Sequence, residues 1–566
     1  MFPNKKTLEE KYNKPKLPHK ARLSGKIDET DVKIAIKAII NNYDDLIALE
    51  EKIKKSIEKE HPNKDISFRL IIINLGAIFE MNFEQLGKMF INDQNPELSD
   101  FLKEFTNIPS ISQEELSDTK KEFTSIWNEI EELAYIIKED YHKIYREQGD
   151  SEFIEILMDE RKAKPYGVAL MMKGINMTRW FKSEIIPQNN KYPNSLLLRA
   201  LFYGALMTPK GGIPGLVKML NERVYKTQEG YVDIGYSLGF YFGMPSMKKF
   251  YRFTERLSSD FMYKIMLENA KELIKIGCAD IRMLLIDSTE IFGRRDDMDL
   301  PAINRDKSTH KMTYRIQLIC DPNQIPLIAV TRLGNEIDQS GFISIIDGLL
   351  YIKKSAEQYG KEIEFVLDDA GYFNPENLEL VRNLIGAKPI FNINPRRSRD
   401  LKVIRNLFEK YKKKYYEKLH DASLPIADQI EVLREAKLTI FDRIEEKCWE
   451  LVQTNSKINK FVAYYILSVG IENFMDIYAR RNVIEGFIGL EKSRFLDLTN
   501  NKNKILVLGK EKVSVRVLLT LIGIQFKALT NYRILKKQNG VIKDLFWVSL
   551  YDILVNYENI PFQEND

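Results

Sequence analysis

The sequence has few cysteines, which excludes two kinds of small scaffold. Its three cysteines, Cys278, Cys320 and Cys448, lie far apart, with no CxxC pair and no cluster of cysteine with histidine. A disulfide framework or a structural zinc site needs such groupings, so we expect neither. Isolated cysteines are compatible with a reducing compartment.

Long apolar runs are also missing. Segments such as RLIIINLGAIF and VLLTLIGI are shorter than the run of about 20 residues that spans a bilayer. The opening residues MFPNKKTLEEK lack the apolar core of a secretion signal. We therefore expect a cytoplasmic protein that has no membrane partner.

The chain has little net charge, but its charge is uneven. Its 566 residues carry 85 Lys and Arg and 81 Asp and Glu, which gives a net charge of +4. Residues 1–26 nevertheless hold eight Lys or Arg against two Glu, and residues 396–420 hold ten against three acids. Local basic patches on a nearly neutral chain fit a polyanionic partner, although a solvated surface is the usual explanation of any single run.

Helical patterns dominate the first half of the chain. A basic arm (1–26) precedes a helical domain at residues 27–159, where amphipathic segments such as DVKIAIKAIINNYDDLIALEEKIKKSIEK are separated by Pro and Asn clusters. No motif in this domain indicates a chemistry, so DNA binding, dimerisation and simple packing remain alternatives. A second helical region covers residues 160–279.

One segment of the second region is a candidate DNA reader. VDIGYSLGFYFGMPSMKKFYRFTERLSS predicts a short helix, a Gly/Pro turn and a longer helix that starts near Ser246. Lys248, Arg252 and Arg256 form a basic i, i+4, i+8 stripe on the longer helix, beside an apolar face. Such a helix-turn-helix could enter a DNA groove, and a packed helix with a solvated basic edge explains the pattern about equally well.

From about residue 280 the pattern changes to strands. Three buried or alternating runs, IRMLLIDSTEIF, KMTYRIQLICD and IPLIAVTRLG, precede a helix, a buried strand EFVLDD, a short helix and a further strand. This order predicts an α/β layer with a mixed sheet flanked by helices.

The predicted layer is interrupted. It occupies residues 280–395 and 466–535, on either side of a basic helical insertion at 396–465, and a tail follows at 536–566. The run FVAYYILSVG, near the end of the insertion, is interpreted as strand-like, and KILVLGKEKV as a strand before the buried helix VSVRVLLTLIGIQFKAL.

The segment YARRNVIEGFIGLEK (478–492) predicts one helix with a polar stripe. At about 3.6 residues per turn, Tyr478, Arg481, Glu485 and Lys492 share a stripe about 60° wide. An exposed helix usually scatters its charges. A tyrosine, two cations and a carboxylate in register therefore indicate a site.

Two more acids follow strand-like runs far upstream: Asp287 in MLLIDST and Asp369 in EFVLDDAGY. Three acids from separate rigid elements suit Mg²⁺, which takes a few carboxylates together with water and phosphate oxygens. Divalent ions in such a site assist phosphoryl transfer. For either aspartate alone, a turn or helix cap is the better explanation.

In combination these motifs resemble the insertion-sequence DDE transposases that have a ribonuclease-H-like catalytic core. The spacing Tyr-(2)-Arg-(3)-Glu-(6)-Lys, the signature of one group in that family, is matched in full at residues 478–492. The first-acid motif is matched at Asp287 in LLIDST. The second is matched at Asp369, which Gly371 and Tyr372 follow, and Asp368 is the competing choice.

The resemblance implies a function and a role for each residue. Asp287, Asp369 and Glu485 would be catalytic ligands of two Mg²⁺ ions per site, with Mn²⁺ as a substitute. Arg481 and Lys492 would grip phosphates near the scissile bond, and Tyr478 would contact the DNA backbone.

The implied enzyme is a cut-and-paste transposase. It would bind terminal inverted repeats in double-stranded DNA, cleave at the element's ends and join them to target DNA, as a homodimer in the synaptic complex. Whether it forms hairpin ends stays open. The alternatives are a transposase-derived DNA-binding protein without catalysis, and a ribonuclease-H-type nuclease without strand transfer.

The insertion departs from the better-known relatives, whose insertions are rich in β-structure. Trp449 lies in this insertion, where relatives that make hairpin ends stack a flipped base on an aromatic side chain. A place in the core is the favoured explanation for Trp449. Arg396 and Arg397 in NPRRSR, at a strand end, are the better candidates for DNA contact.

Overall fold

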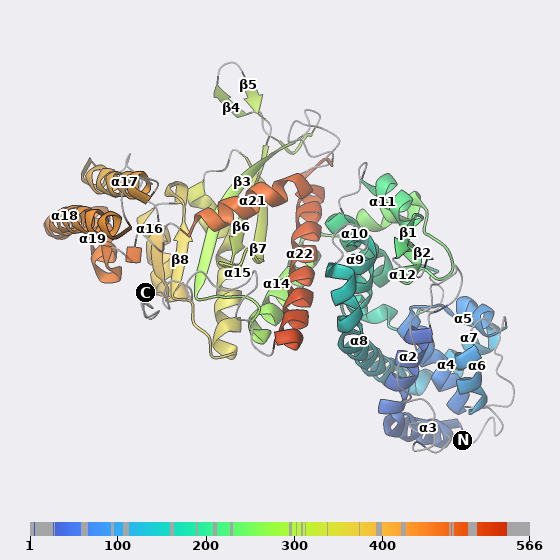
Figure 1. The fold of residues 1–566 in the computed structure, drawn as a ribbon. Coiled ribbons are helices and arrows are strands. Elements are labelled where there is room, and N and C mark those ends of the chain that lie inside the picture. Colours follow the sequence, from blue (N-terminus) through green and yellow to red (C-terminus); the bar gives the residue numbers. More distant parts are fainter. Residues whose placement is uncertain are drawn as a thin grey trace. The chain divides into compact units, whose positions relative to one another are not determined.

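The structure, a computed structural model, divides into two units. Unit 1 is Met1–Leu257 and unit 2 is Ser258–Asp566 (Figure 1). The described residues are 5, 27, 29–57, 66–91, 96–105, 113–158, 164–187, 191–207, 212–226, 230–293, 297–300, 303–306, 309–311, 313–334, 336, 338–372, 374–391, 399–419, 426–471, 473–474, 477, 480–495 and 507–539.

Unit 1 is mainly helical, as the sequence predicts. Helix α4 (Ile66–Phe79) is buried at every position except Arg69, and it packs against the long helix α8 (Trp127–Met158). The remaining helices are α2 (Glu29–Asn41), α3 (Tyr43–Ile57), α5 (Phe83–Ile91), α6 (Pro96–Lys103), α7 (Gln113–Glu122), η1 (Thr124–Ile126), α9 (Lys164–Lys173), η2 (Met177–Trp180), η3 (Lys182–Glu184), α10 (Asn194–Met207), α11 (Ile213–Leu220), α12 (Ile234–Ser237) and α13 (Met247–Thr254).

Unit 1 contains a short hairpin that the sequence patterns above did not predict. Strand β1 (Arg223–Lys226) pairs antiparallel with β2 (Gly230–Asp233). Each strand contains a Val-Tyr or Tyr-Val pair, and TQEG lies between these pairs in the sequence. β-Branched and aromatic residues on both sides of such a segment favour a hairpin over a helix.

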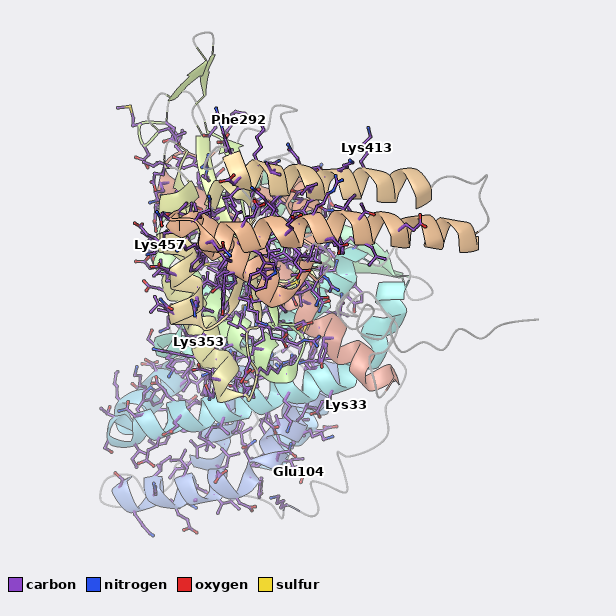
Figure 2. The ribbon with its side chains drawn as sticks, turned by 90° about the vertical axis from the view of Figure 1, so that its left-hand side faces the viewer. Lys33, Glu104, Phe292, Lys353, Lys413 and Lys457 are labelled. Carbon is purple, nitrogen blue, oxygen red and sulfur yellow. The ribbon has the colours of Figure 1, made fainter. Side chains whose placement is uncertain are left out.

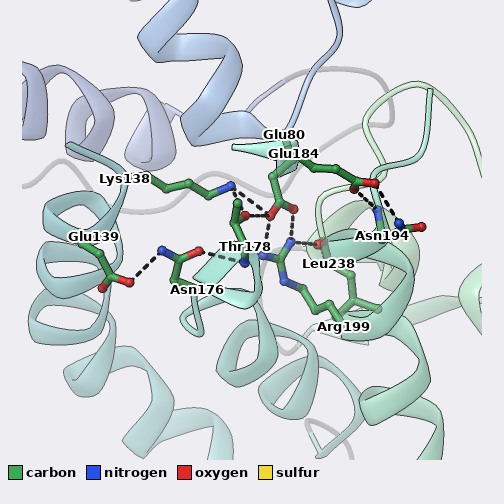
Figure 3. A network of polar contacts seen from close by, with 9 residues as sticks. All are labelled: Glu80, Lys138, Glu139, Asn176, Thr178, Glu184, Asn194, Arg199 and Leu238. Carbon is green, nitrogen blue, oxygen red and sulfur yellow. Dashed lines mark hydrogen bonds and ion pairs between the residues drawn. The ribbon is translucent and has the colours of Figure 1, made fainter. Parts of the chain in front are cut away.

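A buried polar network ties the helices of unit 1 together (Figure 3). Glu80, in the turn after α4, accepts hydrogen bonds from Arg199 on α10 at 2.7 Å and from Lys138 on α8 at 3.1 Å. The hydroxyl of Thr178 on η2 accepts from Lys138 and donates to Glu80. Burial opposes ionisation of Glu80, but the charges of Arg199 and Lys138 outweigh it and hold the pKa of Glu80 well below its usual range.

Unit 2 is built on one mixed sheet, as predicted. In the described chain its five strands stand in the order β7-β6-β3-β8-β9. The β7–β6 and β6–β3 pairs are antiparallel, whereas β3–β8 and β8–β9 are parallel. The strands are β3 (Met283–Phe292), β6 (Thr313–Cys320), β7 (Pro326–Leu333), β8 (Phe365–Asp368) and β9 (Lys388–Phe391).

Three helices pack against β7: α14 (Ser259–Ile276), α15 (Asp338–Gln358) and α22 (Lys510–Asn539). Helix α14 also packs against both α15 and α22. Helix α14 therefore belongs to unit 2, whereas the sequence analysis placed it before the boundary at residue 279. The stretch Lys510–Arg533 of α22 is long and apolar enough to cross a membrane, so the expectation that such runs are too short is wrong for this helix. Because 83% of its apolar window is buried inside the protein, it has the environment of a core helix.

The remaining elements of unit 2 lie around this layer and in the insertion. They are β4 (Ile303–Asp306), β5 (Thr309–Lys311), η4 (Ala370–Tyr372), α16 (Pro375–Leu380), η5 (Val381–Ile385), α17 (Arg399–Leu419), α18 (Ile426–Gln453), α19 (Lys457–Val469) and α21 (Asn482–Phe495). Strands β4 and β5 form a hairpin between β3 and β6 that was not predicted. Figure 2 shows α17 and α18 side by side, with Lys413 on α17.

Two strand predictions in unit 2 are wrong. The run FVAYYILSVG forms most of helix α19, whose buried positions include Val462, Ile466 and Val469 at helical spacing. The side chain of Ser456 caps this helix by accepting a hydrogen bond from the backbone of Asn459. Of the strand predicted at 504–513, residues 510–513 form the first turn of α22, and 504–506 lie outside the described residues.

The Glu80 network generates a stability prediction. Glu80→Gln removes the charge that compensates two buried cations, so it should lower the free energy of unfolding of unit 1 by about 3–5 kcal/mol. Glu129 forms an exposed ion pair with Lys52 at 2.7 Å, so Glu129→Gln should cost at most about 1 kcal/mol. Urea unfolding measures both values, and equal costs for the two variants would contradict the prediction.

Candidate functional site

Strand register brings the first two predicted acids together. In the parallel pair of β3 and β8, Leu285 lies opposite Leu367. Asp287 and Asp369 each follow two residues later, so both fall at the same level of adjacent strands and on the same face. Asp369 comes directly after β8, as predicted. Asp287 does not end its strand, because β3 continues to Phe292.

Helix α21 brings the third acid, but it is shorter than predicted. It begins at Asn482, and Arg481 lies in the turn before it, so the prediction of one helix from residue 478 is wrong. Ile484, Phe487 and Ile488 form its buried face, and α21 packs against β3. This spacing of apolar residues leaves Glu485 on the solvent side, with about half of its side chain exposed.

Arg481 joins the three acids. Its guanidinium lies 2.9 Å from Glu485 Oε1, 3.5 Å from Asp369 Oδ1 and 3.6 Å from Asp287 Oδ2. The first and third of these distances end on the same nitrogen, Nη2, so the carboxylates of Glu485 and Asp287 are close neighbours. Residues that are far apart in the sequence therefore converge on one cation.

The sequence motifs did not predict this contact of Arg481 with the acids, because the resemblance implies a contact with DNA phosphates instead. The i, i+4 spacing of Arg481 and Glu485 was the available signal, because oppositely charged side chains at this spacing commonly pair.

The electrostatics of Asp287 agree with this geometry. The pKa of Asp287 is raised from its usual 3.8 to about 6, chiefly by burial, and the negative charges of Asp369 and Glu485 act in the same direction. The Arg481 guanidinium and the backbone N–H of Ser288 act in the opposite direction. The charges of Arg481, Asp369 and Glu485 thus all act on the pKa of Asp287.

The structure also distinguishes Asp369 from its neighbour Asp368. The side chain of Asp369 is 39% exposed and faces Arg481. Asp368 is fully buried, its Oδ1 accepts the backbone N–H of Asp369 at 2.7 Å, and burial raises its pKa well above the usual range. Asp369 is therefore the acid that belongs to the cluster.

The donor set has the chemistry of a magnesium site, because carboxylate oxygens are the ligands that Mg²⁺ prefers. As the side chains stand, however, no group of three or more His, Cys, Asp or Glu in the described residues could hold a metal ion. Arg481 lies among the oxygens that would have to converge. The three acids match Mg²⁺ in the chemistry of their donor atoms, and their side chains would have to converge further to hold it.

The other site residues predicted for this region are not among the side chains that the structure describes. Lys492 is on α21, but its side chain is not described, and Tyr478, Arg396 and Arg397 lie outside the described residues.

The predicted basic helix of unit 1 is confirmed in part. Helix α13 starts after Ser246, whose side chain accepts the backbone N–H of Lys249. Lys248 and Arg252 are exposed on it. Arg256 is also exposed but follows the end of the helix at Thr254, so the stripe of three on one helix is wrong.

Trp449 is on the surface of the insertion. It is 55% exposed on α18, and its indole N–H donates to Glu445 at 3.4 Å. The favoured explanation, a place in the core, is therefore wrong for this residue.

No family model and no curated protein sequence matches the chain.

The raised pKa of Asp287 generates a prediction about pH. An acid whose pKa is raised by folding binds its proton more tightly in the folded state. The contribution of Asp287 to the unfolding free energy should therefore fall as the pH rises from about 4 through about 6. Asp287→Asn cannot ionise. Without divalent cations it should be as stable as the wild type at pH 4 and about 3 kcal/mol more stable at pH 7.

Amide hydrogen exchange of β3 peptides measures this difference within unit 2. The exposed Asp347 on α15 is a matched control, and Asp347→Asn should follow the wild type at every pH. A difference between Asp287→Asn and the wild type that does not grow between pH 4 and pH 7 would contradict the prediction.

Proposed function

We propose that this protein is a DNA transposase that cleaves DNA at the ends of its element and joins the freed 3′ ends to target DNA. One observation carries the proposal. Asp287, Asp369 and Glu485, chosen from sequence motifs up to about two hundred residues apart, meet around one guanidinium. If each acid only capped a turn or a helix, the three would have no reason to lie together.

The strand arrangement supports a ribonuclease-H-like core. Three antiparallel strands, β7, β6 and β3, are followed across the sheet by the parallel strands β8 and β9. The candidate acids occupy the central strand β3, the end of its parallel neighbour β8 and helix α21, which packs on β3. Such rigid mounts suit a reaction that depends on positioning.

Asp287, Asp369 and Glu485 would hold the divalent cations. When bound, two such ions stabilise the attacking and leaving oxygens of an in-line phosphoryl transfer. The protein's own part is to fix these carboxylates on a sheet and a helix. Arg481 and Lys492 would bind phosphate oxygens, which positions the DNA without reading its sequence.

The DNA would contact exposed cations and one exposed aromatic side chain. Lys248, Arg252 and Arg256 are exposed in unit 1, and Trp449 is exposed on the insertion. We assign the three cations to the transposon end and Trp449 to stacking on an unpaired base. Synapsis of two ends would require a homodimer.

The test uses a supercoiled plasmid that carries the inverted repeats flanking the gene, with Mg²⁺ or Mn²⁺. Asp287→Ala and Glu485→Ala should each lower nicking by more than the roughly 10–100-fold that changes outside the ligand shell cost. Binding to the ends, measured by gel shift, should be unchanged. The exposed acid Glu362 is the matched control, and Glu362→Ala should cleave normally.

Other outcomes favour a different function. End binding by the wild type without any cleavage would support a non-catalytic DNA-binding protein. Cleavage without joined products would support a nuclease that lacks strand transfer. Full activity of Asp287→Ala would remove the acid cluster from the mechanism.

A further inference from the structure

Arg481 is shared by three carboxylates rather than dedicated to one. An arginine that serves a single carboxylate usually makes two parallel hydrogen bonds of about 2.7–2.9 Å. Here only the contact with Glu485 is that short, whereas those with Asp369 and Asp287 are 3.5 Å and 3.6 Å. The guanidinium thus balances the charge of a group of acids from a position between them.

The oxygens that surround Arg481 are the same ones that a divalent cation would need. A guanidinium and a metal ion are both positive, so they repel each other at such short range. We propose that Arg481 is the resident counterion of the acid cluster, and that it competes with divalent cations for Asp287, Asp369 and Glu485. This inference rests on the proposed function, because it takes the three acids as cation ligands.

The exchange would take rotations of side chains, those of the acids as well as that of Arg481, because the described acids do not form a metal-binding group as they stand. The backbone of Arg481 is fixed, since its carbonyl accepts the N–H groups of Ile484 and Glu485 at the start of α21. Its long side chain carries the charge on a stem of rotatable bonds. The side chains of Asp369 and Glu485 are 39% and 49% exposed, so a cation can reach them from solvent while Arg481 is leaving.

Competition has a definite consequence for affinity. A cation that must displace Arg481 binds the acids more weakly than it would if Arg481 were absent. The loss of affinity grows with the strength of the contact between Arg481 and the acids. Removing the competitor should therefore tighten cation binding. If Arg481 instead helped to hold the cation in place, replacing Arg481 would weaken cation binding.

The experiment measures Mn²⁺ binding to the full chain without DNA. Titration calorimetry gives the affinity, and the electron paramagnetic resonance signal of free Mn²⁺, which falls as the ion binds, gives a second measure of it. Arg481→Gln should bind Mn²⁺ at least about tenfold more tightly than the wild type, equivalent to about 1.4 kcal/mol. Adding Glu485→Gln to this variant should remove the gain. Arg481→Lys keeps the charge with fewer fixed donors, so it should lie between the wild type and Arg481→Gln.

A matched control is available in the same unit. Arg282 forms an ion pair with Asp280 at 2.8 Å, outside the cluster. Arg282→Gln also removes one positive charge beside an aspartate, and it should leave Mn²⁺ affinity unchanged. Equal tightening in Arg282→Gln and Arg481→Gln would reduce the effect to net charge and overturn the inference.

Thermal unfolding provides a second readout. Without divalent cations, Arg481→Gln removes the positive charge that the three acids share, so its Tm should fall below that of the wild type. Mg²⁺ should then raise the Tm of this variant by more than it raises that of the wild type. If Arg481→Gln does not fold without cations, Arg481→Lys carries the test. Wild-type Mn²⁺ affinity or weaker binding in the folded variants would overturn the inference.

The two proposals can fail separately. Tighter Mn²⁺ binding by Arg481→Gln in a chain that never cuts DNA would keep the counterion role and refute the transposase. DNA cleavage by the wild type, together with unchanged Mn²⁺ affinity in Arg481→Gln, would do the reverse.

Discussion

The contact on which the candidate site depends is that of one guanidinium with three carboxylates. Asp287, Asp369 and Glu485 carry like charges at short range, and burial of Asp287 intensifies their repulsion. Arg481 lies within 4 Å of all three and forms an ion pair with each of them. Its positive charge therefore offsets the repulsion among the three acids.

That contact in turn depends on how unit 2 fixes its parts. The β3–β8 register sets the positions of the two aspartates, and α21 packs on both β3 and α22. The start of α22 is held by acids from the segment after β3, since Asp297 accepts the N–H of Gly509 and Asp299 that of Lys510. Asp297 also accepts the hydroxyl of Tyr314 on β6. The sheet thus anchors the helix on which α21 rests.

The sequence predicted the succession of strands along the chain and the three acids that meet at Arg481, because apolar runs and motif spacing are local signals. It did not predict register, which depends on the turns and on pairing across the sheet. It also misassigned α19, since Phe, Tyr, Val and Ile favour strands by propensity while its buried residues follow a helical period. Helix α21 starts later than predicted, because a stripe of polar residues at helical spacing does not mark where a helix begins.

Charge balance explains why Asp368 can lie beside this cluster. A fourth ionised carboxylate would add repulsion that one arginine could not offset. Burial instead raises the pKa of Asp368 well above its usual range, which favours its neutral form, while its Oδ1 orients the backbone of Asp369. Two adjacent aspartates with the same chemistry therefore serve different purposes. One shapes the end of β8, and the other presents its charge to Arg481.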